Sequence, residues 1–273
     1  MGILNVTPDS FSDGGKFLDP GLAVARARQM AEEGALFIDV GGASSRPAGQ
    51  TYGAGAEPVL AEVELERVLP VVKAIVRQLP EVIISVDTFR ASVAEAVIAE
   101  GAHLINDITA LRHSPEIADH VAKAGAGLAL MHSRGFVGSM PAEASYKDVV
   151  AEVTASLVDA ARQAREKGVN SILLDPGFGF GKSVEDNFRL IDGVDRLTSA
   201  GYPVLVGISR KSSIGVALGS ADRPAPVADR LFGSLGATAV AVMRGASIVR
   251  THDVRQTSEM IRGLLPSAGR SIV

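Results

Sequence analysis

The stretch VIISVDTFRASVAEAVIAEGAHLIND, residues 82–107, sets the folding pattern of the whole chain. It holds two short apolar runs, Val82–Val86 and Leu104–Ile105, separated by the amphipathic segment Ala91–Glu100. Apolar runs of this length predict strands, and the longer periodic segment predicts a helix. A strand, a helix and a second strand in this order indicate two parallel strands joined by a helical crossover.

The same alternation continues along the chain, giving about eight strands, the number that a closed parallel barrel requires. An open, doubly wound sheet would alternate in the same way, so the pattern by itself favours the barrel only somewhat. Further strands are predicted at Gly2–Leu4, Leu36–Val40, Leu128–Met131, Ile172–Leu174, Val204–Ile208 and Ile248–Val249, and further helices at Gly21–Glu33, Val63–Gln78, Lys147–Lys167 and Asp186–Thr198.

Length and composition agree with one globular domain. The 273 residues fall within the range of about 200 to 400 residues of single α/β barrels. Apolar residues make up 47% of the chain, enough for a sizeable core, and no Pro/Gly/Ser-rich linker divides it. We therefore predict a single (β/α)8 TIM barrel domain over residues 1–273.

Composition also excludes several function classes. The chain has no cysteine, which rules out disulfides, thiolate nucleophiles and cysteine-based metal sites. The net charge of −4 and the lack of a Lys/Arg-rich block argue against nucleic-acid binding. No apolar run approaches the roughly 18 residues of a membrane-spanning helix. We expect a cytoplasmic protein with no membrane partner.

Polar and glycine-rich segments follow the apolar runs. In a parallel barrel these positions are the carboxyl ends of the strands, where such enzymes place their chemistry. Turns alone need Gly, Pro, Asn and Asp but not repeated Arg, Lys and His, so we favour a functional role over simple turns. In chain order the segments are NVTPDSFSDGG, DVGGASSRP, VDTFR, IND, MHSRG, DPGFGFGK, SRKS and RTHD.

One set of these residues suits a flat heterocycle. Asp87, Asn106 and Asp175 each end an apolar run, and such groups are costly to bury without partners. A ring with N–H and amino donors on one edge and acceptors on another would pair with two carboxylates and an amide. For any single residue, capping the next helix is about as probable as ligand binding. The three together favour a ligand.

A second set suits phosphate. Lys211 and Arg250 would follow strands seven and eight, the usual phosphate position of a TIM barrel. Arg250 and His252 are two residues apart and so point the same way along a strand. The other members of this set are Arg46, Ser209 and Asn5.

The stretch Gly177–Gly181, followed by Lys182, matches a P-loop only in part. Pro176 stands where that motif needs its first glycine, so a nucleotide triphosphatase is not predicted.

Taken together, these segments resemble the dihydropteroate synthase family. NVTPDSFSDGG, residues 5–15, is close to the first signature of the family, and IDVGGASSRP, residues 38–47, is close to the second. SVDTFR, LINDI, LMHSRG, LLDPGFGFGK, VGISRKS and VRTHDV follow in the order of the family. Eight matches in order are highly specific and cover nearly the whole chain.

The resemblance implies condensation of 6-hydroxymethyl-7,8-dihydropterin pyrophosphate with 4-aminobenzoate, with Mg²⁺, in a homodimer formed through the last helices. The implied pterin site is Asp87, Asn106, Met131, Asp175, Phe180 and Lys211. The implied pyrophosphate site is Asn5, Ser45, Arg46, Arg250 and His252, with Asn5 also meeting the metal. The implied 4-aminobenzoate site is Ser45, Arg46, Pro47, Ser209 and Lys211. Within these sets, Asn5, Asp87, Lys211, Arg250 and His252 are expected to be catalytic.

The implied chemistry is an electrophilic alkylation, in which pyrophosphate leaves the pterin methylene and the aromatic amine attacks the resulting cationic carbon. Developing negative charge on the leaving group calls for cations in a site with little water. The segments Thr7–Gly15 and Gly42–Ala48 are expected to close over the substrates. No covalent intermediate is required, which agrees with the absence of cysteine.

The chain departs from the family pattern at a few positions. Ala43 stands where an acidic residue is usual, Ser45 where threonine is frequent, and Ser213 where an aromatic is common. We expect Ser213 to border the aminobenzoate side and to alter competition by sulfonamides. Two alternatives stay open: a catalytically silent pterin-binding homologue, and a pterin-dependent methyltransferase domain, which has no use for Asn5, Arg250 and His252.

Overall fold

The computed structural model describes residues 1–7, 19–43, 59–135 and 145–267. A parallel sheet of six strands runs in chain order, and two further strands pair in parallel beside it. The six are β1 (Gly2–Asn5), β2 (Phe37–Gly41), β3 (Ile83–Asp87), β4 (Leu104–Asp107), β5 (Gly127–Met131) and β6 (Ser171–Asp175); the other two are β7 (Leu205–Val206) and β8 (Ile248–Val249).

Single bridges close these strands into a barrel. Leu174 of β6 pairs with Val204, the residue before β7, and Gly2 of β1 pairs with Thr251, two residues after β8. The amide of Ile3 donates to the carbonyl of Thr251 at 3.0 Å. The first and last strands are therefore neighbours, which confirms the predicted barrel and excludes the open sheet. The strand predicted at Val204–Ile208 is shorter in the structure, where only Leu205 and Val206 pair regularly.

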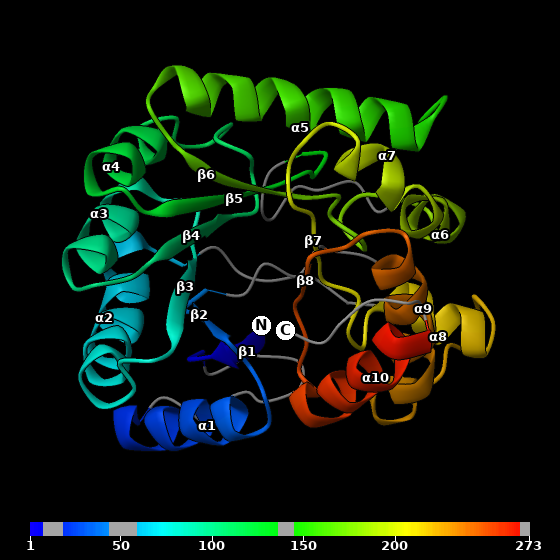
Figure 1. Cartoon of the computed structure of the whole chain (residues 1–273), viewed down its shortest axis with the longest axis horizontal. Helices are drawn as coiled ribbons and strands as arrows, with labels where there is room; N and C mark the ends of the chain where they lie inside the picture. Colours follow the sequence, from blue (N-terminus) through cyan, green and yellow to red (C-terminus); the bar gives the residue numbers. More distant parts are fainter. Residues whose placement is uncertain (8–18, 44–58, 136–144, 268–273) are drawn as a thin grey trace.

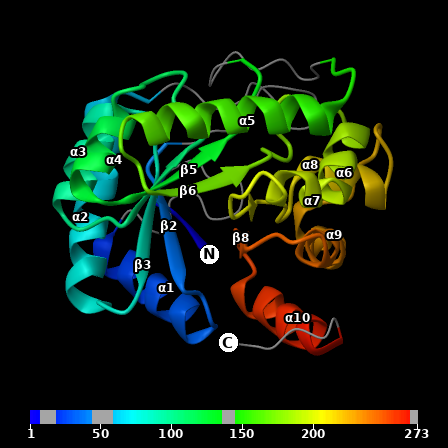
Figure 2. The same ribbon diagram turned by 45° about the horizontal axis from the view of Figure 1, so that its top comes forward.

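Helices surround the strands. Figure 1 shows α1 to α4, in blue to green, along one side and α6 to α10, in yellow to red, along the other, and the turned view of Figure 2 agrees. No described helix is long and apolar enough to cross a bilayer. Their bounds are α1 (Pro20–Glu32), α2 (Ala61–Gln78), α3 (Ala91–Ala99), α4 (Ile117–Ala124), α5 (Val149–Glu166), α6 (Val184–Asp192), α7 (Val194–Thr198), α8 (Ser212–Leu218), the 3₁₀ turn η1 (Val227–Arg230), α9 (Leu231–Met243) and α10 (Val254–Ser267).

The single helix predicted at Asp186–Thr198 is wrong, because the chain breaks there into α6 and α7. Gly193 stands at the break and packs against α5 so closely that a Cβ on it would lie 2.7 Å from the methyl carbons of Val150. The close contact between Gly193 and the Val150 side chain overrides the apolar periodicity from which one helix was predicted.

The core of the barrel is largely aliphatic, and two of its strands carry a buried carboxylate. Ile38, Ile84 and Leu128 are fully buried within their strands, as expected for parallel strands covered on both faces. Asp39 and Asp175 are also buried in strands, although a buried carboxylate needs a partner. All strands of a parallel barrel end on the same side, so these carboxylates mark the mouth of the barrel.

Candidate active site

Strand register brings the predicted site residues at the first four strands side by side. Asn5 is opposite Gly41, Gly41 opposite Asp87, and Asp87 opposite Asn106, each at the carboxyl end of its strand. Asp39, two residues before Gly41, is opposite Ser85 one layer deeper. The mouth of the barrel therefore has a layer formed by Asn5, Asp87 and Asn106, and the Asp39 carboxylate lies below it.

The Arg250 side chain joins the two layers. It follows β8, and its Nε donates to Asp39 Oδ2 at 2.6 Å while Nη2 donates to Asp87 Oδ2 at 3.2 Å. Asp39 also accepts from Ser85 Oγ at 2.5 Å and from Asn106 Nδ2 at 3.3 Å. Breaking a buried ion pair leaves an uncompensated charge, which is strongly destabilising.

Asp39 is missing from the set predicted from sequence. Asp87 and Arg250 are predicted there to serve separate sites, yet they share one ion-pair cluster with Asp39 at its base. A signal is present in the sequence: FIDVG is an apolar strand with a carboxylate in its middle, and such a carboxylate needs a buried cation.

Burial dominates the electrostatics of this cluster. It raises the pKa of Asp87 to about 7, although the Arg250 guanidinium acts in the opposite direction. Burial also raises the pKa of Asp175, which the Lys211 ammonium opposes. The pKa of Lys211 is lowered to about 7, chiefly because its ammonium is removed from water. Such groups change charge easily when a ligand arrives, as active-site groups often do.

Lys211 and Asp175 are brought together by the glycine-rich segment after β6. Asp175 Oδ1 accepts from the amide of Gly177 at 2.7 Å. Lys211 Nζ donates to the carbonyl of Phe178 and lies 4.3 Å from the centre of the Phe180 ring. Gly179 leaves room for the stem of Lys211, since a Cβ there would come within 2.8 Å of Lys211 Cδ.

Two buried side chains missed from sequence hold this segment. Lys182 Nζ donates to the carbonyls of His132, Gly177 and Phe180 at 3.2, 2.9 and 3.1 Å. The ammonium donates to backbone carbonyls rather than to a phosphate, which agrees with the prediction that this segment is not a P-loop. Asn187 accepts from the amide of Gly179 at 2.6 Å and donates to Ser213 Oγ at 3.0 Å. The Ser213 hydroxyl is thus committed to this network; its effect on sulfonamides stays a prediction.

An apolar patch stands beside these polar groups. Met131, Phe89 and Ile108 form a small buried cluster against which Phe180 packs. Met131 and Phe180 therefore meet as expected, and Phe89 and Ile108 are additions. The buried Oδ1 of Asn106 has no hydrogen-bond partner among the described residues. A buried unpaired acceptor needs an explanation, and a ligand donor supplies one.

His252 is held by Ser209. Ser209 Oγ lies 3.0 Å from His252 Nδ1 and accepts from the amide of His252 at 3.2 Å. Burial lowers the pKa of His252 to about 3, so the ring is neutral rather than cationic. The contact between Ser209 Oγ and Nδ1 is compatible with either ring tautomer, and in the one where the hydroxyl donates to Nδ1 the ring proton is on Nε2. His252 can then serve as a neutral donor to an anion.

Several predicted residues lie outside the described residues or make no contact within them. Ser45, Arg46 and Pro47 are outside, as is most of the two segments expected to close over substrates. The side chain of Asn5 makes no hydrogen bond to any described residue, and its Oδ1 lies 3.4 Å from a Cβ built on Gly41. No described residues form a cluster of three or more His, Asp or Glu that could hold a metal.

The chain is similar to known proteins over nearly its whole length. Residues 1–252 match the model of the pterin binding enzyme family. The chain is 43% identical over 264 residues to the dihydropteroate synthase of Escherichia coli K12, covering 96% of this chain and 89% of that one.

Solved structures are similar as well. The Xanthomonas albilineans dihydropteroate synthase with 4-aminobenzoic acid is 42% identical, with a TM-score of 0.87 and coverage of 99% of this chain and 93% of that one. The Yersinia pestis dihydropteroate synthase in complex with a sulfonamide drug is 38% identical, with a TM-score of 0.89 and coverage of 98% and 93%.

The glycine-rich segment yields a stability prediction. Gly177 has φ of +69° and a Cβ on it would lie 1.9 Å from the carbonyl oxygen of His132, whereas Gly125 has φ of +68° and nothing within 4 Å. In urea unfolding, Gly125→Ala should lose about 1 kcal/mol from backbone strain alone, and Gly177→Ala about 2 kcal/mol or more because it also clashes. Equal losses of unfolding free energy in the two variants would show that the glycine-rich segment adjusts to the added Cβ and is not rigid.

Proposed function

The chain belongs to the pterin-binding enzyme family as one of the dihydropteroate synthases, and we propose that the residues at its barrel mouth carry out the reaction of that family. The enzyme is a transferase of folate biosynthesis, joining 6-hydroxymethyl-7,8-dihydropterin pyrophosphate to 4-aminobenzoate to give 7,8-dihydropteroate and pyrophosphate. The observation that supports this proposal is the strand register at the mouth: Asp87 lies opposite Asn106, whose Oδ1 has no partner among the described residues, and Asp175 lies opposite Met131 of the apolar cluster.

The pterin ring would bind at that patch. Asp87 and Asp175 offer carboxylate acceptors for the ring N–H and amino donors, and Asn106 Oδ1 offers a third acceptor. Phe180 and Met131 would contact the faces of the ring. The low-dielectric surroundings that shift the pKa values of the carboxylates also strengthen these hydrogen bonds.

The pyrophosphate would lie between β1 and β8, beside the ring. Arg250 Nη1 makes no hydrogen bond among the described residues, so one edge of the guanidinium is available while the other is anchored on the carboxylates. Neutral His252 would donate from Nε2 and Asn5 from its amide. Negative charge that develops as the pyrophosphate departs would then meet donors already fixed in place.

Asn5 suits the Mg²⁺ that the family implies. Its amide oxygen is a hard ligand without a partner in the described part of the chain, and Mg²⁺ commonly binds one or two protein oxygens together with substrate phosphates. When bound, Mg²⁺ would neutralise charge on the leaving pyrophosphate. The protein side of the site would be Asn5 alone among the described residues, with phosphate oxygens and water completing it.

The aminobenzoate would approach from the side of β7. Ser209 and Lys211 border that side, and Ser45, Arg46 and Pro47 are proposed to complete it. The amine needs no activating base stronger than its own lone pair, because the carbon it attacks is cationic. Since the Yersinia relative binds a sulfonamide drug, we propose that this chain binds sulfonamides in the same place.

The turnover test is incubation of purified protein with dihydropterin pyrophosphate, Mg²⁺ and 4-aminobenzoate. We expect dihydropteroate, and we expect Arg250→Ala to lower kcat by about 100- to 1,000-fold through loss of charge stabilisation in the transition state. Unfolding of the variant is followed alongside, because Asp39 loses its cation. Pterin binding without turnover in the wild type would support the silent homologue, and wild-type kcat in a folded Arg250→Ala variant would contradict the role of the arginine.

Pterin binding should depend on pH through Asp87. Its pKa of about 7 lies above that of a free aspartate, so the acceptor carboxylate is present above pH 7 and is lost as the pH falls through 7. The Kd of 6-hydroxymethyl-7,8-dihydropterin, which carries no phosphate, should rise by up to tenfold per unit between about pH 7 and pH 5.5. Asp87→Asn should bind weakly with little change over that range. A wild-type Kd that stays constant there would rule out this ionisation.

A second copy of the chain is the proposed partner, in the cytoplasm and without membrane or nucleic-acid partners. Helix α9, LFGSLGATAVAVM, has no charged residue, and Phe232, Val240 and Met243 on it are 82%, 46% and 49% exposed. Beside it lies a groove of about 250 Å³ lined by Ile214, Leu218 and other apolar side chains. A helix that is apolar on all sides is normally covered, so we propose α9 as the dimer interface.

Phe232→Glu should convert a dimer to a monomer, because a charge would be buried at the interface. Molar mass from light scattering after size exclusion measures this directly. Leu36→Glu is the control, since Leu36 is 73% exposed and lies outside α9. A dimer that survives Phe232→Glu would place the interface elsewhere.

A further inference from the structure

The backbone at Arg210 is left-handed, with φ of +58°. Arg210 stands between Ser209 and Lys211, both of which border the proposed aminobenzoate site. This conformation is unfavourable for a residue with a Cβ, and it persists only where the surrounding structure imposes it. The turn therefore requires contacts that impose it.

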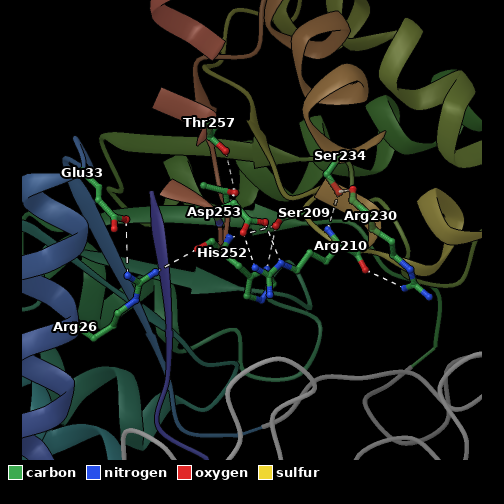
Figure 3. A network of polar contacts seen from close by, with 10 residues as sticks. Arg26, Glu33, Ser209, Arg210, Arg230, Ser234, His252, Asp253 and Thr257 are labelled. Atoms are coloured by element: carbon green, nitrogen blue, oxygen red, sulfur yellow. Dashed lines mark hydrogen bonds and ion pairs between the residues drawn. The ribbon is translucent and has the colours of Figure 1, made fainter. Parts of the chain in front are cut away.

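Three different elements supply those contacts (Figure 3). The amide of Arg210 donates to Ser234 Oγ on α9 at 2.9 Å. Its carbonyl accepts from Arg230 Nη1 on η1 at 3.0 Å. Its guanidinium donates to both carboxylate oxygens of Asp253, after β8, with Nε at 2.9 Å from Oδ2. The backbone donor, the backbone acceptor and the side chain of one residue are all engaged.

Arg230 is the most buried member of this network, with 3% exposure. Its Nε donates to the carbonyl of Ala225 at 2.8 Å, and its own carbonyl accepts from Ser234 Oγ at 2.8 Å. The guanidinium lies flat against α8, because a Cβ on Gly215 would come within 2.6 Å of it. Burying a guanidinium is costly unless its donors are paired, and one of its acceptors here is the strained peptide of Arg210.

The same network reaches His252. Asp253, which holds the Arg210 guanidinium, follows His252 directly, and the His252 carbonyl accepts from Arg26 Nη2 at 3.3 Å (Figure 3). The His252 ring meets Ser209 at 3.0 Å. The turns after β7 and β8 are thereby fixed to each other as well as to α9.

We propose that Arg230 and Ser234 are positioning residues for the reaction: they hold Arg210 left-handed, and that turn sets the directions of Ser209 and Lys211. The proposal rests on the function proposed above, because it assigns the turn to the aminobenzoate side of that site. Neither residue needs to contact substrate.

The test compares Arg210→Gly with Arg210→Ala, alone and in an Arg230→Met background. Both substitutions remove the guanidinium, and they differ in that only glycine adopts positive φ freely. We expect kcat/KM for 4-aminobenzoate to be roughly tenfold higher with glycine than with alanine. In the Arg230→Met background, glycine should match or exceed arginine at position 210, whereas alanine should fall below it.

Glycine also relieves backbone strain and so raises stability, and kcat/KM is therefore compared at a temperature where thermal unfolding shows every variant to be fully folded. Arg244→Ala is the control, because it removes another Arg–Asp pair, with Asp192, at the surface and far from the turn in sequence; its kinetic constants should equal those of the wild type. Equal kcat/KM for the glycine and alanine variants would overturn the proposal. So would an Arg230→Met variant with a lower unfolding midpoint and unchanged kcat and KM.

A different result would show that the proposed function, rather than the positioning role of Arg230 and Ser234, is wrong. If the wild type forms no dihydropteroate, that function fails, and the same variants are then compared by calorimetric titration with 4-aminobenzoate in the presence of pterin and pyrophosphate. Tighter binding to the glycine variant than to the alanine variant would still support the positioning role, and equal binding would overturn it.

Discussion

The structure depends on one buried interaction, the ion pairs of the Arg250 guanidinium with Asp39 and Asp87. These carboxylates are 211 and 163 residues away from Arg250 in sequence, so the contact joins the start of the barrel to its last strand. Asp39 is fully buried and would be very costly to leave without a cation. The cluster therefore exists only in the closed barrel, where the segment after β8 reaches the carboxylates of β2 and β3.

Burial at the mouth of the barrel also changes the ionisation of other polar groups there. Burial moves the pKa of Asp87 up and that of Lys211 down, and both arrive near 7. A ligand that donates hydrogen bonds to the carboxylate, or brings phosphate near the ammonium, can select the charged form of each. A ligand is held in one orientation more effectively when the groups around it are rigid. Lys182 and Asn187 provide this rigidity by binding backbone groups of the glycine-rich segment.

Much of this arrangement can be predicted from the sequence, because each apolar run ends in a residue that strand geometry places at the mouth. Asp87, Asn106 and Asp175 are predictable for that reason. Asp39 is harder to predict, since it lies inside its strand rather than at the end. The sequence excludes a P-loop at Lys182 but does not indicate that the ammonium binds three backbone carbonyls. The break at Gly193 and the left-handed Arg210 depend on distant packing, which local periodicity does not record.

The most direct measurement is a crystal structure of the protein with a non-hydrolysable analogue of dihydropterin pyrophosphate. We expect the bicyclic ring between Met131 and Phe180, hydrogen-bonded to Asp87, Asn106 and Asp175, with the diphosphate against Arg250, His252 and Asn5. Density for the ring at any other end or face of the barrel, with the Arg250 cluster untouched, would contradict it.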